Sequence, residues 1–303
     1  MVHVRRSLLT LLALAFIAVF GSGAERRFEK KFPASPGGTL TLKTDVGTVK
    51  VSGTSSKEVS IEATIRGKER AVKEFEITAE QTSNGVSVEG RAHEKGGWLF
   101  HFDEGVDVEF LVKVPDQYNL DVHTSGGDLL LGDVKGNVTG HTSGGNIDVV
   151  NVTGKADLQT SGGNVKAERI TGDAKLETSG GDVRLSKATG EVDASTSGGT
   201  IAISDVDGSV RAETSGGDVT VKVKGANKGV HAETSGGDIE IMIAKSVGAT
   251  IDASTSGGSV VCDMPVTMSG RIDESRVKGT VNGGGATIFA HTSGGDVRIK
   301  ALE

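Results

Sequence analysis

The feature that most constrains the fold of this chain is a tetrapeptide, Thr-Ser-Gly-Gly, which occurs nine times. Its copies begin at Thr124, Thr142, Thr160, Thr178, Thr196, Thr214, Thr234, Thr255 and Thr292. The first six copies are spaced by 18 residues, and the later spacings are 20, 21 and 37 residues. A fixed period near 20 residues indicates a repeat architecture, in which each unit packs against its neighbours.

A single unit, residues 178–195, predicts two short strands. Val183 and Leu185 follow the glycine pair and alternate with charged residues, and Val192 and Ala194 alternate in the same way further along. Alternation with a period of two indicates a strand with one buried face. Two one-sided strands per coil predict an all-β fold, a parallel β-helix-like solenoid of 18-residue coils with a thin core. A β-propeller would need about 40 residues per blade.

The same apolar columns recur along the repeats. The first strand places inward the pairs Leu129/Leu131, Ile147/Val149, Val165/Ala167, Ile201/Ile203, Val219/Val221, Ile239/Ile241, Val260/Cys262 and Val297/Ile299. The second strand contributes Ala156/Leu158, Ala174/Leu176, Val210/Ala212, Val230/Ala232, Ile251/Ala253 and Ile288/Ala290. The 37-residue spacing is about two periods, which predicts a degenerate coil near residues 273–279. The spacings of 20 and 21 residues predict small insertions, such as residues 225–229.

Residues 1–24 have the pattern of a signal peptide. Arg5 and Arg6 precede an apolar run over residues 7–20, and Ser22-Gly23-Ala24 offers small residues for cleavage. The apolar run is shorter than the roughly 20 residues of a comfortable transmembrane helix. We therefore expect an exported protein, periplasmic, surface-bound or secreted, without a membrane span once the segment is removed. Retention of the segment as an uncleaved anchor is the alternative.

The sequence predicts two regions after residue 24. Residues 25–120 are β-rich but irregular, with a short helix near residues 68–75, a hairpin around Asn84-Gly85 and a strand over residues 106–114 that ends at Pro115. This region is expected to begin the solenoid and to shield its open end, because an exposed last coil is an unpaired edge. Residues 121–303 form the repeat solenoid.

Composition narrows the classes of partner and of chemistry. Glycine accounts for 45 of 303 residues, and aromatic residues for 4%, which suits a core too thin for large rings. The formal net charge of −7 argues against nucleic acid as a partner, because nucleic-acid binding depends on basic patches. Cys262 is the only cysteine and falls in an inward column, so we expect a small core residue rather than a reactive thiol.

The residue after each glycine pair suggests a calcium site. This column contains Asp128, Asn146, Asn164, Asp182, Thr200, Asp218, Asp238, Ser259 and Asp296. Calcium-binding β-rolls use Gly-Gly-x-Gly-x-Asp in nine-residue units, and the spacing here differs. Asp and Asn also suit tight turns, which is the interpretation that we favour.

Three further patterns suggest possible sites. His123 and His141 should stack on adjacent coils, and with His291 they occupy one column; two neighbouring imidazoles can bind zinc, but the column is otherwise simply polar. The threonine column resembles the hydroxyl arrays of ice-binding solenoids, although hydrogen bonds between coils explain it more simply. Residues 98–102 around Trp98 are the least repeat-like stretch, either a contact loop or a packed cap. We therefore predict no catalytic residues, no metal site and no cofactor.

Several stretches together resemble the bacterial "putative adhesin" family, whose members contain a domain of unknown function with β-strand repeats. They are residues 28–33 with Gly37-Gly38-Thr39-Leu40 nearby, residues 112–115, the repeated Thr-Ser-Gly-Gly-Asp-Val, Asn282-Gly-Gly-Gly285 and the closing repeat to Ile299. The resemblance covers residues 28–299. It implies an exported, envelope-associated β-solenoid with no established activity and no known catalytic residues.

These observations predict a non-enzymatic scaffold of the cell envelope or exterior that presents a repetitive polar surface for adhesion to a protein or polysaccharide. Two alternatives remain open: a repeat protein that depends on calcium or another metal, and an enzyme that acts on surface polysaccharide. The sequence names neither the ligand nor the oligomeric state.

Overall fold

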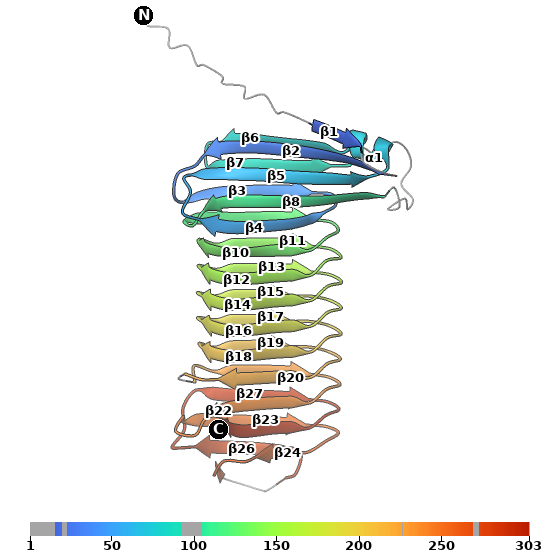
Figure 1. Ribbon diagram of the computed structural model, residues 1–303. Helices are drawn as coiled ribbons and strands as arrows, with labels where there is room; N and C mark the ends of the chain where they lie inside the picture. The colour runs from blue at the N-terminus through green and yellow to red at the C-terminus, as the bar shows by residue number, and fades with distance from the viewer. Residues whose placement is uncertain (1–15, 20–22, 93–104, 226, 269–272, 303) are drawn as a thin grey trace, which may run out of the picture.

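The chain folds into two long, facing β-sheets joined coil by coil into a flattened rod (Figure 1). The structure is a computed structural model and describes residues 16–19, 23–92, 105–225, 227–268 and 273–302. Each sheet has 14 strands, and the sheets form an open stack rather than a barrel. The predicted all-β solenoid is therefore confirmed.

Along the repeats, successive strands of the chain belong alternately to the two sheets, which are called sheet A and sheet B. Sheet A contains, in spatial order, β1 (Phe16–Val19), β2 (Ala24–Pro33), β5 (Glu58–Gly67), β8 (Val106–Pro115), β4 (Thr48–Thr54), β10 (Leu129–Lys135), β12 (Ile147–Thr153), β14 (Val165–Thr171), β16 (Val183–Thr189), β18 (Ile201–Asp207), β20 (Val219–Val223), β22 (Ile239–Ala244), β28 (Val297–Leu302) and β24 (Val260–Cys262). Sheet B contains β25 (Thr267–Met268), β26 (Arg276–Val281), β23 (Ala249–Thr255), β27 (Thr287–Thr292), β21 (Val230–Thr234), β19 (Val210–Glu213), β17 (Val192–Ser195), β15 (Ala174–Glu177), β13 (Ala156–Thr160), β11 (Val138–Thr142), β9 (Tyr118–Thr124), β3 (Gly38–Thr44), β7 (Gly85–Arg91) and β6 (Glu76–Thr82).

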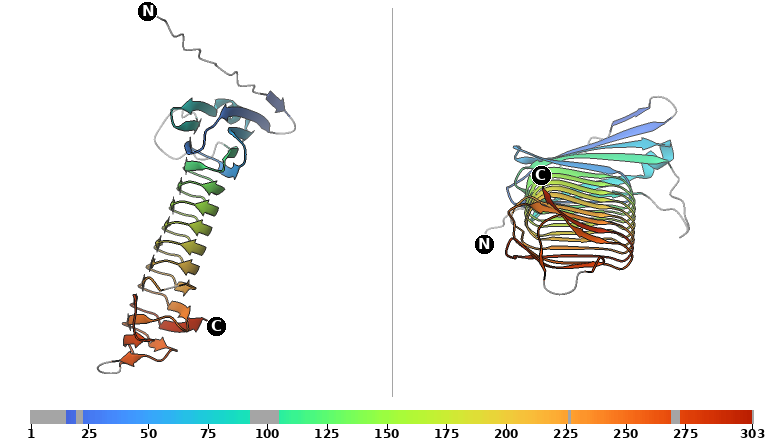
Figure 2. Two further views of the ribbon diagram at one scale, coloured as in Figure 1. Left: turned by 90° about the vertical axis from the view of Figure 1, so that its left-hand side faces the viewer. Right: turned by 90° about the horizontal axis from the view of Figure 1, so that it is seen from below.

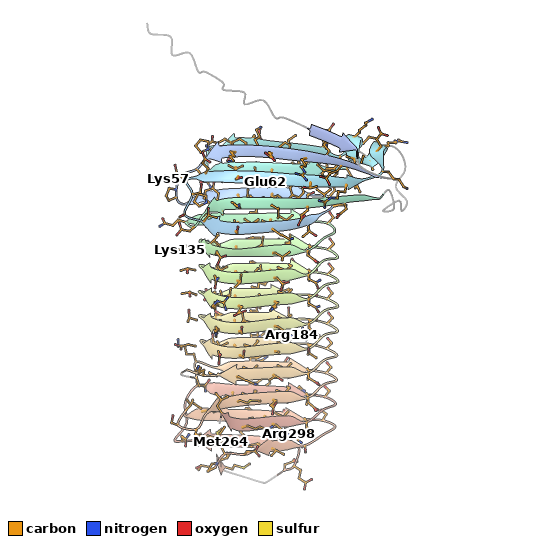
Figure 3. The ribbon with its side chains drawn as sticks, in the orientation of Figure 1. Lys57, Glu62, Lys135, Arg184, Met264 and Arg298 are labelled. Atoms are coloured by element: carbon orange, nitrogen blue, oxygen red, sulfur yellow. The ribbon has the colours of Figure 1, made fainter. Side chains whose placement is uncertain are left out.

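The coils stack in register, as the 18-residue period requires. Val183 of β16 pairs with Val165 on one side and Ile201 on the other, in parallel. Val183 and Leu185, and their counterparts in the other coils except Cys262, are almost completely buried between the sheets. Arg184 lies on the outer face of sheet A (Figure 3). The alternation that the sequence predicts is thus confirmed.

In five coils, those of β10, β12, β14, β16 and β18, the first strand carries a third inward position after a bend. After Leu185 the chain bends at Lys187, whose φ is 60°, and Ala188 then faces the core again. The equivalent bend residues Asp133, Asn151, Arg169 and Asp205 have φ between 55° and 60°. Left-handed backbone at residues other than glycine is uncommon, so these five bends are a built feature of the coil.

The threonine of each repeat hydrogen-bonds one coil to the next. The Thr178 hydroxyl donates to the carbonyl oxygen of Gly163 in the preceding coil, at 2.8 Å, and the Gly181 amide donates to the same hydroxyl, at 3.3 Å. The repeat threonines are buried, with Thr178 only 7% exposed. They satisfy backbone groups at the corner and present no hydroxyl array to solvent.

The second glycine of each pair is required for space. A side-chain carbon at Gly181 would lie 2.1 Å from the Gly163 carbonyl oxygen, and the same clash recurs at Gly163, Gly199 and Gly217. The φ of Gly181 lies outside the left-handed region. Gly181 is therefore needed for space, because the two coils approach too closely there for any other residue.

The N-terminal region starts the stack and covers its first end. β3 and β4 form the first coil, since they pair in parallel with β9 and β10. Beyond them β8, β5 and β2 extend sheet A, where β5 pairs antiparallel with both β2 and β8, and Figure 2 shows this part wider than the repeat rod. The predicted helix is α1 (Glu69–Glu74), and the predicted hairpin is β6–β7.

The C-terminal coil is inserted into the stack rather than added to its end. β27 lies between β21 and β23, and β28 lies between β22 and β24. Hydrogen bonds follow this order: Thr292 donates to Gly237, and Thr255 donates to Gly295. Stacking in sequence order, which the repeat suggests, is therefore wrong here. The coils present equivalent columns, which allows the C-terminal coil to pair in register with the coil of β21 and β22.

The degenerate coil predicted near residues 273–279 is also wrong. This stretch contributes to β26, which runs antiparallel to β23 and to β25, and β25 is the edge strand of sheet B. The stretch therefore closes the last coil and adds no further coil. The insertion predicted at residues 225–229 corresponds to the segment between β20 and β21, of which residue 226 lies outside the described part.

The predicted signal segment lies outside the described residues except for β1 and residues 23–24. Within the described part of the chain, no helix is long and apolar enough to span a membrane.

Candidate functional site

A groove of about 520 Å³ lies on the outer face of sheet A, where the N-terminal strands meet the first coils. Its lining includes Leu111 of β8 and Leu130 of β10, which are 41% and 38% exposed. Only one other large apolar side chain in the described ranges, Val261, is comparably exposed. The volume of the groove is in the range of ligand-binding clefts, so the groove is the candidate functional site.

Two leucines in one row of outward side chains form the apolar wall of the groove. Leu111 pairs with Lys50 of β4, and Lys50 pairs with Leu130. The row then continues through Asp148 and Lys166 in the next two coils. Leu130 therefore stands at a position where the following coils place charged residues, which concentrates apolar surface at the first coils.

A second row explains why the surface is hollow. Lys113, Ser52, Gly132, Val150 and Glu168 lie opposite one another on β8, β4, β10, β12 and β14. The two small residues in the middle of the row leave the floor low. A side-chain carbon at Gly132 would lie 2.5 Å from the Val150 carbonyl oxygen, so this position cannot be filled without moving backbone.

Charged side chains of both signs surround the apolar wall and the low floor of the groove. Lys50 donates to Glu109 at 2.7 Å, and this hydrogen bond is the main cause that lowers the pKa of Glu109. Asn151 donates to Asp133 at 2.6 Å at one edge of the groove. The groove can therefore bury aliphatic side chains of a ligand on its floor and form ion pairs at its rim.

The sequence analysis did not single out this groove, although one signal was present. Leu129, Leu130 and Leu131 are consecutive, and alternation requires that the middle leucine face outward. Leu111 similarly lies between the inward residues Phe110 and Val112. Outward leucines close together on one sheet face mark a contact surface, but their proximity depends on the parallel pairing of β4 with both β8 and β10.

The side-chain oxygens of the Asp/Asn column bind backbone amides of the next coil. The amide of Asn164 donates to Asn146 Oδ1 at 2.9 Å, and the amide of Asp182 donates to Asn164 Oδ1 at 2.8 Å. Thr200 continues the ladder by donating its amide to Asp182 Oδ1 at 2.9 Å, and this bond is the main cause that lowers the Asp182 pKa. Each side-chain oxygen thus accepts a hydrogen bond from the next coil.

The histidines highlighted by the sequence lie at two ends of sheet B. His123 and His141 stack with ring centroids 4.8 Å apart, as predicted, and His123 contacts Asp121 at 2.7 Å. Burial, and secondly the neighbouring His123, lower the pKa of His141. His291 is far along the stack, where its Nδ1 lies 3.1 Å from the Ser254 hydroxyl. The structure therefore brings two of the three together.

The sequence also singled out Cys262 and the stretch of residues 98–102. Cys262 pairs with Ile299 in the inward column but is partly exposed, because it lies in the last coil. Burial is the main cause that raises its thiol pKa, so the thiol is protonated at neutral pH. The stretch of residues 98–102 around Trp98 lies outside the described residues.

Comparison with known proteins identifies the family. The family model described as Toastrack DUF4097 matches residues 38–300, which is most of the chain. The chain belongs to this family. The family resemblance predicted from the sequence is therefore confirmed, and the Toastrack match spans both the N-terminal strands and the repeat coils.

Solved structures similar to this Toastrack chain include three named for adhesion. They are a "putative adhesin" from Bacteroides fragilis (16% identity, TM-score 0.40, covering 91% of this chain and 97% of that one), a "putative adhesin" from Parabacteroides merdae (13%, 0.44, 91% and 96%) and a "putative cell adhesion protein" from Clostridium sporogenes (14%, 0.23, 90% and 99%). Identities and TM-scores this low give no basis for transferring a function. No curated protein matches the chain.

Proposed function

We propose that this Toastrack protein is a non-enzymatic, exported binding protein of the cell envelope or exterior, and that it acts in adhesion. The observation that carries the proposal is the groove on sheet A, where Leu111 and Leu130 are exposed in one row of outward side chains, on either side of Lys50. Large exposed apolar side chains gathered at a hollow mark a binding surface.

The chemistry of the groove favours a segment of another protein as the occupant. Its wall is aliphatic, and its rim offers lysines and carboxylates, so it suits a segment with an aliphatic side chain flanked by charged residues. Burying an aliphatic anchor excludes water at the centre, and ion pairs at the rim select the partner. The lining of the groove contains no histidine and no cysteine.

Export is part of the proposal and rests on residues 1–24. An arginine pair, an apolar run and small residues before Glu25 together fit a cleaved signal peptide. N-terminal sequencing of protein recovered from the periplasm or medium of producing bacteria is expected to begin at Glu25. Recovery of the intact chain only from the cytoplasm would contradict export and leave the binding surface to be tested separately.

A displayed random-peptide library tests the binding surface directly. Selection on the immobilised protein is expected to enrich peptides with an aliphatic residue flanked by charges. A variant with Leu111→Lys and Leu130→Lys should retain less than about a tenth of this binding, because charge is placed where apolar burial is needed. The matched control is Val261→Lys, since Val261 is also 41% exposed but lies in β24 at the other end of the rod.

Circular dichroism should show both variants folded, since all three side chains face solvent. Peptides that bind the double variant as well as the unmodified protein would overturn the groove as the binding site. Failure to enrich any peptide would overturn a protein segment as the occupant.

A further inference from the structure

A second cluster of chemically active side chains lies on the outer face of sheet B, far from the groove. Glu213 of β19 and Glu233 of β21 are paired directly across neighbouring strands. His231 lies two residues before Glu233 on the same face of β21. One ligand atom from each residue can be chosen so that all three atoms lie within 4.8 Å of one another.

The distances within the cluster match those between ligands of one small metal ion. His231 Nε2 lies 3.3 Å from Glu213 Oε1 and 3.4 Å from Glu233 Oε1. Tetrahedral ligands bound at the usual zinc distances of about 2.0–2.1 Å are separated by about 3.3–3.4 Å. The nitrogen is therefore spaced from each oxygen as it would be around a shared ion, and all three ligand atoms lie within 4.8 Å of one another.

The imidazole nitrogen itself provides an independent observation. His231 Nε2 is buried beneath its neighbours and has no hydrogen-bond partner, a state that only His141 Nδ1 shares among the described side chains. It approaches both carboxylates without being aligned to donate a hydrogen bond to either. A nitrogen that lies near two carboxylate oxygens and donates to neither can serve as a metal ligand through its lone pair.

Neighbouring residues fix the ring and set the local charge. The Phe289 ring of β27 stacks on the His231 ring, with centroids 4.7 Å apart and 12° between the planes. Arg211 contacts Glu213 from the same strand. The two stacked carboxylates repel each other across the ladder, and a cation between them removes that cost. Arg211 supplies part of the compensation and competes with an added ion.

We propose that Glu213, His231 and Glu233 bind one divalent transition-metal ion, for which Zn²⁺ is the probe. A nitrogen ligand favours a first-row transition metal over Ca²⁺, which prefers an all-oxygen set. Three protein ligands leave the remaining coordination position to water, because the site lies on an outer face where His231 is 35% exposed.

Isothermal titration of the purified protein with ZnCl₂ tests the site. One equivalent is expected to bind, with far weaker binding of CaCl₂. His231→Ala and Glu233→Gln should each weaken Zn²⁺ binding by at least about tenfold, the lower bound seen even for residues that only support a ligand. Arg211→Ala should tighten binding, because it removes a competing cation without removing a ligand.

The matched control is His141→Ala, which removes a half-buried imidazole from the same face of sheet B several coils away. It is expected to leave Zn²⁺ affinity unchanged. Circular dichroism and thermal unfolding establish that each variant is folded. The proposal is overturned if the unmodified protein binds no Zn²⁺, if His231→Ala binds as tightly as the parent, if Ca²⁺ binds equally well, or if Arg211→Ala weakens binding.

Discussion

At the scale of single residues, the two glycines of each repeat have different physical roles. A side-chain carbon at Gly180 would meet its nearest atom at 3.5 Å, an ordinary contact, whereas at Gly181 it would lie 2.1 Å from a backbone carbonyl oxygen. Adjacent positions in one corner therefore differ sharply in tolerance. The contrast comes from the close approach of successive coils and not from the φ angles.

The glycine pair leads to the first prediction. Gly181→Ala should destabilise the protein by more than about 2 kcal/mol, because two coils must move apart to accept the methyl group. Gly180→Ala should stay within about 1 kcal/mol, since it also reduces the freedom of the unfolded chain. Urea denaturation of both variants provides the measurement. Equal losses would show that the corner is not as tightly packed as described.

A second prediction at this scale concerns pH. Burial lowers the pKa of His141 in the folded protein below its unfolded value of about 6.5. Between these two pKa values the unfolded chain binds more protons, so this residue contributes stability above about pH 6.5 that is lost as the pH falls through its folded pKa. The free energy of unfolding should therefore decrease on acidification from neutral pH.

The matched variant is His141→Gln, because Gln159 occupies the same column in the next coil. Its free energy of unfolding, measured from pH 7.5 to 5.5, should fall less steeply than that of the parent. His123, Asp121, Asp157 and Glu177 face the same imidazole and remain in both proteins, so the difference between the two curves isolates His141. Superimposable curves would contradict the prediction.

At the scale of the strand, an inward residue and its outward neighbour should differ in what they tolerate. Leu185 of β16 is buried, whereas Arg184 is exposed and contacts Asp182 at 2.8 Å. Leu185→Asp should cost at least about 3 kcal/mol, because it places an unpaired charge in a thin core. Arg184→Asp should cost at most about 1 kcal/mol. Denaturant unfolding decides between them, and similar costs would mean that β16 does not alternate as described.

The Asp/Asn ladder is also an element, running along one corner of the stack. Its oxygens accept backbone amides at 2.8–2.9 Å in coil after coil, so the corner is satisfied without calcium. Thermal unfolding should give the same midpoint with and without a calcium-selective chelator. A midpoint lowered by several degrees in chelator would show that the ladder needs an ion.

The sequence predicts what happens within a coil better than what happens between coils. Alternation around Val183 and Leu185 is enough to assign both inward columns. The left-handed bend at Lys187 leaves no sequence signal, because Asp, Asn, Arg and Lys all occupy that position. The groove at Leu130 and the cluster at His231 each depend on which strands become neighbours, and strand pairing is a long-range property that residue patterns specify weakly.

At the scale of the whole molecule, the inserted coil predicts unequal effects of two deletions of similar length. Removal of residues 286–303 deletes β27 and β28 from inside the stack and leaves the last coil without its neighbour. We expect loss of cooperative unfolding or a midpoint lowered by more than about 10 °C, because each coil is stabilised by the coils on both sides.

Deletion of residues 160–177 is the matched control. It removes one interior coil but joins positions that are equivalent in the ladder, since Thr142 pairs with Thr160 and Lys166 with Arg184. This shortened protein should remain folded and unfold in one transition. Circular dichroism during heating compares the two deletions. A C-terminal deletion as stable as the interior deletion would contradict the strand order assigned to β27 and β28.

The position of the C-terminal coil, formed by β27 and β28, also determines when folding of the molecule can be completed. Residues 287–302 follow β23 and β24 in the chain, yet they form a layer between strands that precede them. The rod therefore cannot be completed by adding coils in the order of synthesis; the coil of β23 and β24 must wait for β27 and β28. Until β27 and β28 have been made, the coil of β21 and β22 and the coil of β23 and β24 have open strand edges that can pair with other chains. A chain that reaches its compartment unfolded meets this requirement naturally, because all of its coils become available together.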